Sequence, residues 1–360
     1  MEKKSKRRVF WEQISGNLDF VGTWLIGALV LLAGFISDLI TSIASETVNW
    51  VGLGLKGAGV LAFIICAVIY LRRIYRTSAW MVIPKHIPIL FAIGVTKDKV
   101  DETFQKVKDT LTKETGFKDF KAFEKYFGVN YSDLVIHRGE RIRSDAGEWS
   151  NVLYEAQWQI GRFTCRIPGD KTYHIFILGP ASLAIGFGAI MGVKHRIIVY
   201  QYLDNEYKPV LDLAGANIRR IKETVSGDLR YLDFQPPEET TSNTALLLGL
   251  ASHFVEEDAR SYISSNNVAG SIVTVRNTYA GNLKELDWTR AVQELFSVFT
   301  VLKSAGRLDC IHLFHGIPVA LAFGLGMALG TFIHIMVYNW EQKENKYYPV
   351  LELNKLPSIL

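Results

Sequence analysis

The sequence predicts a doubly wound α/β protein made of two similar units, preceded by a pair of long apolar helices. The first observation behind this prediction is an internal repeat. Residues 174–192 align with residues 312–330 without a gap, sharing a histidine, a phenylalanine, a proline, a Leu-Ala pair and three glycines. The match resumes in two further pairs of segments, 196–200 with 334–338 and 207–213 with 347–353. A repeat of this length indicates that both units share one supersecondary plan.

The second observation is an alternation of short apolar runs with amphipathic stretches after residue 86, typical of a mostly parallel sheet covered by helices. The first unit, residues 87–215, predicts strands at 87–95, 133–137, 174–178, 196–202 and 207–213, with helices at 100–114, 148–159 and 181–192. The second unit, residues 243–360, predicts strands at 244–251, 271–276 and 310–314 and a terminal pair, with helices at 256–264, 288–304 and 318–329. Residues 216–242 contain a prolyl turn and are predicted to connect the units.

The third observation is a pair of apolar runs, residues 20–44 and 48–71, each long enough at about 1.5 Å per residue to cross a hydrocarbon core of roughly 30 Å. We interpret residues 20–76 as a transmembrane hairpin. Residues 1–19 are basic, so a cleaved signal peptide is the alternative for the first run. The run is too long for one, and the second run follows after only three residues. Basic residues on both outer sides predict cytoplasmic ends, with residues 77–86 as a linker.

Charge and cysteine content exclude several classes of protein. The formal charge is +4, and the first ten residues alone carry five basic and one acidic side chain, so the remaining 350 residues are neutral overall. A large basic face for duplex nucleic acid is therefore not expected, whereas a local pocket for a small anion is compatible with this balance. Cys66, Cys165 and Cys310 form neither a disulfide framework nor a zinc motif.

The predicted topology places a ligand site at particular strand ends. For a strand order of 2-1-3-4-5, ligands bind beyond the carboxyl ends of strands 1 and 3. Each third strand runs through Gly and Pro into a helix, which leaves backbone N–H groups free to receive phosphate. The glycines in these two helices predict a close approach of helix to sheet, although packing of small residues explains any one of them equally well. They are Gly186, Gly188, Gly192, Gly324, Gly326 and Gly330.

These segments resemble the SAVED domain, a cyclic-oligonucleotide sensor built from two fused CARF-like units, which are Rossmann-like. The resemblance spans most of residues 87–353 and rests on segments 175–184 and 312–326 and on two Val-Tyr pairs, each followed by Tyr-x-Pro-Val-Leu. With the apolar hairpin in front, the chain is similar to the two-transmembrane SAVED effectors of bacterial antiphage systems that signal through cyclic oligonucleotides (CBASS type).

The resemblance implies a sensor and effector anchored in the bacterial inner membrane. A cognate nucleotidyltransferase would make a cyclic di- or trinucleotide, and the SAVED pocket would bind it. Ligand-bound copies would then oligomerise and disrupt the lipid bilayer, which causes abortive infection and so provides antiviral defence. No cofactor and no duplex nucleic acid are implied.

The candidate ligand-binding residues lie at or just after strand ends, where they offer cations, backbone N–H groups or aromatic rings. They are Thr96, Lys97, Arg138, Gly179, Pro180, Ser182, Tyr202, Ser252, His253, Arg276, His315, Gly316, Pro318 and Trp340. We expect one asymmetric site across both units, because the third strand ends in Leu-Gly-Pro in one and His-Gly-Ile-Pro in the other. His174 and His312 are expected to fill strand positions, and no metal site is predicted.

Two charged residues fall within the predicted hairpin. Asp38 and Lys56 lie at similar depths, so they are expected either to pair within one hairpin or to line a polar seam in a multimer. The small residues at 54–59 supply a face for close helix association.

Two alternatives remain open. The first is an enzyme that degrades its own cyclic ligand. No dinucleotide-binding glycine motif, phosphate-binding lysine loop or nucleophile triad is present, so we expect no catalytic residues. The second alternative is a membrane-tethered receptor that signals to a separate partner protein, with the hairpin as a passive anchor.

Overall fold

The computed structural model divides the chain into two compact units, Met1–Lys85 with Pro168–Asp170, and His86–Ile167 with Lys171–Leu360. The structure describes residues 18–44, 50–82, 85–115, 124, 128–143, 145–167, 169–215, 217–225, 227–251, 256–279, 283, 287–306 and 308–357.

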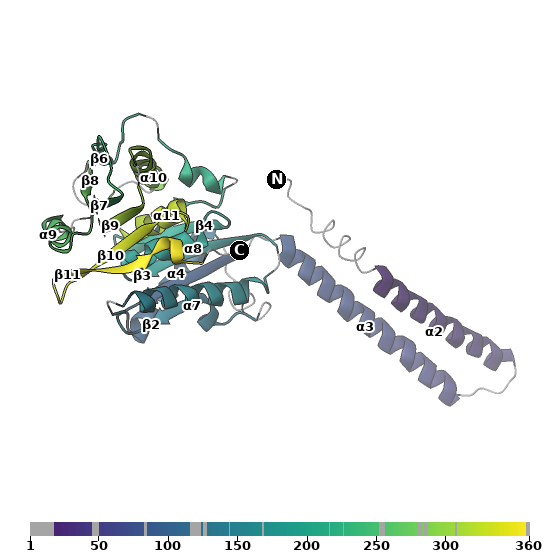
Figure 1. The fold of residues 1–360 in the computed structure, drawn as a ribbon. Coiled ribbons are helices and arrows are strands. Elements are labelled where there is room, and N and C mark those ends of the chain that lie inside the picture. Colours follow the sequence, from purple (N-terminus) through teal and green to yellow (C-terminus); the bar gives the residue numbers. More distant parts are fainter. Residues whose placement is uncertain are drawn as a thin grey trace. The chain divides into compact units, whose positions relative to one another are not determined.

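Two helices, α2 (Leu18–Ala44) and α3 (Trp50–Val82), make up most of the described part of the smaller unit and lie alongside each other (Figure 1). Within the described residues, neither helix reaches the combination of length and apolarity that crossing a membrane requires. α3 continues through residues 77–82, where we predicted a linker, because no proline interrupts the sequence before Pro84. The side chain of Lys56 lies outside the described residues, so its pairing with Asp38 stays a prediction.

The larger unit contains two sheets, and the first has the strand order β2-β1-β3-β4-β5. Its strands are β1 (Lys85–Ile93), β2 (Val135–Arg138), β3 (Lys171–Leu178), β4 (Arg196–Leu203) and β5 (Glu206–Asp212). Its helices are α4 (Lys97–Thr115), α6 (Tyr131–Leu134), α7 (Ala146–Thr164) and α8 (Ala181–Met191). β2 pairs with β1 and β4 with β3 in parallel, while β5 returns antiparallel to β4.

The second sheet has the order β11-β10-β9-β7-β8-β6. Its strands are β6 (Leu232–Phe234), β7 (Asn243–Gly249), β8 (Ser271–Asn277), β9 (Cys310–Gly316), β10 (Ile335–Glu341) and β11 (Lys346–Glu352). Its helices are α9 (Glu256–Asn266), α10 (Thr289–Ser304) and α11 (Val319–Leu329), with 3-10 turns η1 (Ile218–Lys222) and η2 (Leu353–Lys355).

The predicted α/β fold and its strand order are confirmed. When the strands of each repeat are numbered in chain order, the first sheet has the order 2-1-3-4-5. The second sheet has the same order from β8 to β11, with β6 as an additional strand at its edge. The likeness extends to irregularities, because the antiparallel pair of each sheet shifts register at the same place, between Val199 and Tyr200 and between Val337 and Tyr338. One strand was not predicted. β6, within the segment predicted as a connector, adds to the outer edge of β8 in antiparallel orientation.

The centre of the larger unit is the contact between the two glycine-containing helices, α8 and α11, drawn side by side in Figure 1. A Cβ added to Gly188 would lie 2.0 Å from the carbonyl oxygen of Phe323, and one added to Gly326 would lie 1.9 Å from that of Ile185. These two glycines therefore serve the approach of one helix to the other, rather than the approach of helix to sheet that we predicted. The two contacts involve equivalent positions of the two repeats. A local pseudo-twofold axis between the helices therefore relates one contact to the other.

Candidate functional site

A cavity of about 340 Å³ lies at the carboxyl ends of β1 and β3, where the strand order predicts a ligand. Residues from both repeats line it: Ile93, Gly94, Arg141, Ile142, Trp149, Pro180, Asn339, Trp340, Glu341 and Gln342. The first repeat supplies the strand ends, the loop after β2 and the start of α7, and the second supplies the end of β10. A molecule bound in this cavity would touch both repeats.

A second cavity of about 320 Å³ adjoins the first and shares five of its lining residues, Arg141, Ile142, Trp149, Asn339 and Glu341. It adds Arg143, Lys343, Glu344, Tyr348 and Val350. We call these two cavities together the seam groove. Each has a volume at the lower end of the range found for small-molecule sites, and together they leave room for a larger ligand.

The loop that forms one wall of the seam groove is held by the start of α7. The Glu148 carboxylate accepts hydrogen bonds from the backbone N–H of Arg143, at 2.9 Å, and from Nη2 of Arg138, at 2.7 Å. These two bonds lower the pKa of Glu148. The indole Nε1 of Trp149 donates to the carbonyl oxygen of Arg143 at 2.7 Å. The loop is therefore fixed by three hydrogen bonds, which order the wall before any ligand arrives.

The seam groove favours an anion. In the part of the chain that the structure describes, no hydrogen bond or ion pair engages the side chains of Arg141, Arg143 or Lys343. The groove also contains two carboxylates: Glu341 accepts from the backbone N–H of Lys343, and Glu344 accepts from the Tyr348 hydroxyl. The three cations outnumber these two carboxylates, and cations of this kind can receive phosphate groups.

Three polar side chains join the repeats next to the seam groove. Ser182, at the start of α8, lies 3.0 Å from Nε2 of His315 in β9 and donates to Oδ1 of Asn339 in β10 at 3.1 Å. Burial lowers the pKa of His315 to about 4, so its ring is neutral near pH 7. Ser182 and His315, two residues predicted from separate strand ends, are thus brought into contact.

The structure places other predicted residues at the same end of the first sheet. Pro180 and Trp340 line the seam groove, and a Cβ added to Gly179 would lie 3.5 Å from the carbonyl oxygen of Ile93 at the junction of β1 and β3. Thr96 and Lys97 are exposed at the start of α4, which follows β1. Thus four residues predicted from the repeat, Pro180, Ser182, His315 and Trp340, belong to the groove or to the contacts that border it.

Three predicted residues do not line the seam groove. Arg276 is bound by Glu256 at 2.7 Å on the outer part of the second sheet, and Arg138 is neutralised by Glu148. Tyr202 lines a separate cavity of about 230 Å³ beside α4, where the Lys106 ammonium lies 5.6 Å from the centre of its ring. These three side chains are not grouped with the seam groove.

Two further predicted residues, Gly316 and Pro318, lie at the equivalent end of the second sheet. The carbonyl oxygen of Gly316 accepts hydrogen bonds from the backbone N–H groups of Leu250 and Ala251, and Pro318 precedes the first turn of α11. Ser252 and His253 lie outside the described residues. Of the two strand ends at which the sequence predicts a ligand, the structure describes the first in more detail.

Sequence reasoning missed Arg141, Trp149 and Asn339, all of which line the seam groove. One signal was available, because Glu148-Trp149-Ser150 and Asp287-Trp288-Thr289 occupy matching places at the start of α7 and α10. Both tryptophans are buried, at 2% and 1% exposure. Arg141 follows no strand directly, and nothing in the local sequence distinguishes it from other loop cations.

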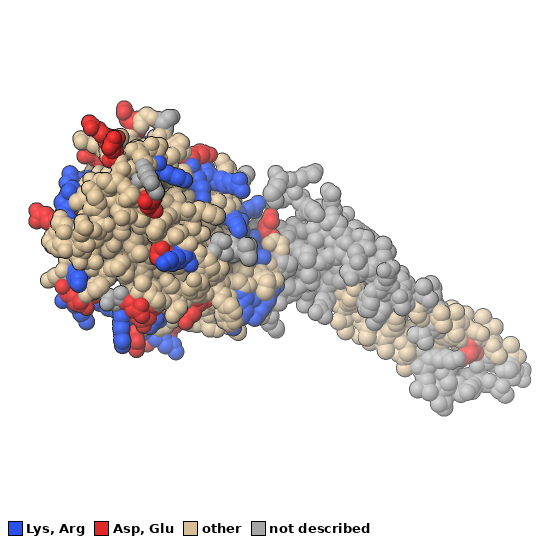
Figure 2. Space-filling view, in the orientation of Figure 1, with Lys and Arg blue, Asp and Glu red and all other residues tan. Residues whose placement is uncertain are grey.

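The surface of the larger unit carries charges of both signs. On the face drawn in Figure 2, lysine and arginine side chains are interspersed with aspartate and glutamate. Among the described residues, no group of three or more His, Cys, Asp and Glu side chains is arranged to hold a metal ion. His174 and His312 instead bond the hydroxyl groups of Tyr200 and Tyr338, at 2.9 and 3.0 Å.

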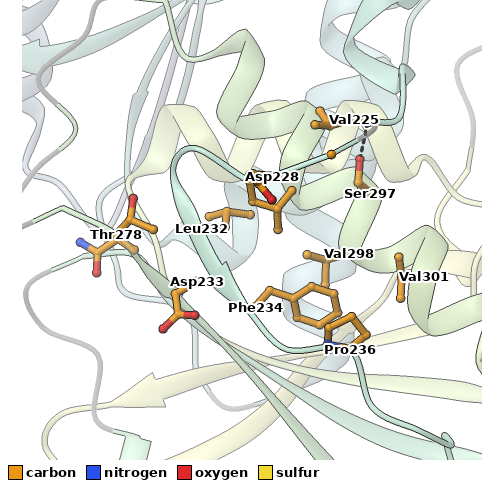
Figure 3. Close-up of a pocket in the computed structure, with 13 residues that line it drawn as sticks. Val225, Asp228, Leu232, Asp233, Phe234, Pro236, Thr278, Ser297, Val298 and Val301 are labelled. Atoms are coloured by element: carbon orange, nitrogen blue, oxygen red, sulfur yellow. Dashed lines mark hydrogen bonds between the residues drawn. The ribbon is translucent and has the colours of Figure 1, made fainter.

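The largest cavity that we describe, about 750 Å³, lies between α10 and β6, the edge strand of the second sheet (Figure 3). Asp228 and Asp233 line it together with Phe234, Pro236 and Val298, and the described residues of its lining include no lysine or arginine. The dashed bond in Figure 3 joins the backbone N–H of Val225 to Ser297 Oγ. Two carboxylates without a cation disfavour an anionic ligand, so we place the candidate site at the seam groove despite its smaller volume.

Part of the chain matches the model of a known protein family. Residues 223–353 match the model of the SAVED family, described as the SMODS-associated and fused to various effectors sensor domain. This segment covers rather more than a third of the chain and includes all the strands of the second sheet. Among curated proteins, none matches the chain.

Solved structures of SAVED/CARF-domain containing Cap4 receptors are also similar. The Acinetobacter baumannii receptor with the cyclic trinucleotide 2'3'3'-cAAA gives a TM-score of 0.47 at 15% identity over 84% of this chain, and that with 3'3'3'-cAAA gives 0.48 at 14% over 84%. The Moraxella osloensis receptor gives 0.45 at 16% over 62%. The chain spans 59%, 59% and 48% of the length of these three receptor chains.

Proposed function

We propose that this protein is a sensor that binds a cyclic oligonucleotide, a cyclic di- or trinucleotide, in the seam groove. The SAVED match over residues 223–353 supports the ligand class, because it identifies a sensor domain in the second repeat. The fold supports the location, because the groove lies at the switch point of a doubly wound sheet.

One observation carries the proposal: both repeats contribute cations to the seam groove, and no hydrogen bond or ion pair engages their side chains in the described structure. Arg141, Arg143 and Lys343 match the phosphates of a cyclic oligonucleotide. Both repeats contribute to the wall, so ligand binding would bridge them.

A titration of the purified full chain tests this proposal. Isothermal titration with a panel of cyclic di- and trinucleotides should give a ligand for the wild type, and Arg141→Ala should weaken its binding at least tenfold. Arg276→Ala is the matched control: it also removes an exposed arginine, but one held by Glu256 on the outer sheet. Equal affinities for Arg141→Ala and the wild type would place the phosphates elsewhere.

The protein acts in this proposal by binding and not by catalysis. The seam groove contains guanidinium, ammonium, amide, carboxylate and aromatic groups, and among the described residues that line it there is no serine, cysteine or histidine. Ligand recovered after overnight incubation should therefore remain cyclic. The appearance of linear product at a rate proportional to protein concentration would support the alternative of a ligand-degrading enzyme.

We propose further that the helical unit is the effector. Ligand-bound copies would oligomerise, and their α2–α3 hairpins would disrupt the bacterial inner membrane, with both termini in the cytoplasm, to cause abortive infection. The composition of residues 20–44 and 48–71 supports this proposal. A cognate nucleotidyltransferase would supply the ligand.

Liposome leakage tests the effector step separately from ligand binding. The full chain with its ligand should release an entrapped dye without any other protein, and Asp38→Leu combined with Lys56→Leu should reduce leakage while ligand affinity stays unchanged. Full leakage by the double variant would show that these charges play no part. If the wild type binds ligand but releases no dye, the hairpin is a tether for a receptor that signals to a partner.

A further inference from the structure

Asn339 occupies a central place in the seam groove, since it lines both cavities and precedes Trp340 on β10. Its side-chain amide is fixed by two hydrogen bonds. Nδ2 donates to the carbonyl oxygen of Trp340 at 3.1 Å, and Oδ1 accepts from the hydroxyl of Ser182 at 3.1 Å. The first bond settles which end of the amide is the nitrogen, because a carbonyl oxygen only accepts and the nitrogen is the only end of the amide that donates.

The Ser182 bond also settles the state of His315. A hydroxyl has one proton, and Ser182 gives it to Asn339, so Ser182 must accept from Nε2–H of His315. Nδ1 of His315 is then a bare acceptor. It is shielded from solvent and has no hydrogen-bond partner within the described structure. A buried acceptor without a partner destabilises a fold.

The other repeat shows what these residues add. Gln201 occupies the place of Asn339, and its Oε1 accepts from the backbone N–H of Ala320 at 3.2 Å. Ala320 stands where the first repeat has Ser182, and Ile177 stands where the second has His315. On that side, the backbone N–H of Ala320 is sufficient to join the repeats. On the seam-groove side, the side chains of Ser182 and His315 orient the amide of Asn339.

We propose that Asn339 reads a base of the ligand and selects adenine, with Ser182 and His315 as positioning residues. This inference rests on the proposed function. A primary amide has two N–H donors and at least two acceptor lone pairs, and the contacts above use one of each. The remaining donor and acceptor match adenine, which presents an amino donor beside a ring-nitrogen acceptor. At the same N7 edge, guanine presents two adjacent acceptors, N7 and O6, which leaves Asn339 Oδ1 facing an acceptor.

The test measures the ratio of the affinities for an adenine ligand and the matching guanine ligand. A ratio is needed because a substitution in the groove can change the affinity for every ligand. The probes are cyclic triadenylate and cyclic triguanylate, and cyclic diadenylate and cyclic diguanylate. The wild type should prefer the adenine member of the better-bound pair by about 10- to 100-fold. Asn339→Asp, which removes the donor, should bring that ratio close to one. Ser182→Ala and His315→Ile, which copy the other repeat, should lower it at least threefold.

Conservative variants separate positioning from general damage. Ser182→Thr keeps the hydroxyl and His315→Gln keeps a donor, so both should restore most of the ratio. Gln201→Glu makes a comparable change on the other side and should leave the ratio unchanged, and melting temperatures verify that every variant is folded.

Two results would overturn the inference while leaving the proposed function in place. One is a guanine preference in the wild type, and the other is a ratio that survives Asn339→Asp. If the wild type binds none of the four probes or any other cyclic oligonucleotide, the proposed function itself is wrong.

Discussion

The two repeats of the larger unit share their framework and differ in their polar contacts. Both have the same strand order and the same register shift, and each contributes one glycine to the central helix pair. In contrast, Glu155 of α7 is exposed, whereas Glu294 at the matching place in α10 is fully buried. The two repeats therefore have the same backbone geometry, whereas their polar side chains differ in burial and in hydrogen-bond partners. The predictions that follow separate these two levels.

The largest effect is expected at the shared framework. Gly326→Ala should lower the free energy of unfolding of the larger unit by about 3 kcal/mol or more, because its Cβ would overlap a backbone carbonyl that cannot move without separating the helices. Gly161→Ala is the control. Gly161 lies in α7 with no atom within 4 Å of an added Cβ, so the variant should gain up to about 1 kcal/mol. Denaturant unfolding measures both, and equal effects would contradict the role of the helix contact.

A smaller effect is expected at the buried glutamate that differs between the repeats. Glu294 accepts from the backbone N–H groups of Arg230 and Tyr231, at 3.0 and 2.9 Å, and from Nε of Arg290. Glu294→Ala leaves those donors without partners and should cost about 3 kcal/mol of unfolding free energy. Glu155→Ala, the matched exposed position, should change it by less than about 0.5 kcal/mol. A small loss for Glu294→Ala would mean that other groups hold β6 and its flanking loop.

The third effect concerns pH. Burial and the neighbouring His86 lower the pKa of His174 to about 3, from an ordinary value of 6.5. Below pH 6.5 the unfolded chain binds a proton that the folded chain does not, so stability falls with acidification, by about 2 kcal/mol at pH 5 from this residue alone. His174→Phe should flatten the dependence of unfolding free energy on pH between 7 and 5.

The matching residue gives the contrast. His312 is only half-buried, and its pKa is lowered by burial and by His334, so His312→Phe should change the slope less than His174→Phe. If both variants gave the same slope as the wild type, protonation elsewhere would have to explain the acid sensitivity.

Much of the framework was predictable, because a repeat with glycine and proline at fixed places reports backbone constraints. Pro180 and Pro318 marked the starts of α8 and α11, and the strand order is the one expected for a doubly wound sheet. The partner of each glycine was not predictable, since Gly188 meets a backbone more than a hundred residues away.

The candidate site was predictable in place but not in composition. Strand ends located Pro180, Ser182 and His315, whose positions are set by local backbone. Arg138 and Arg276 were chosen for their charge, yet both meet a carboxylate that only the fold brings near. Arg141 was missed because its availability depends on a loop held by Glu148 and Trp149.

Hydrogen exchange with and without ligand tests the central claim most directly, because it compares the seam groove with the larger acidic cavity in one experiment. With a bound cyclic oligonucleotide, the amides of residues 138–143 and 339–344 should exchange more slowly, and those of residues 227–236 should be unchanged. Protection confined to residues 227–236, with none at the loop after β2 or at the end of β10, would contradict the account and place the ligand between β6 and α10.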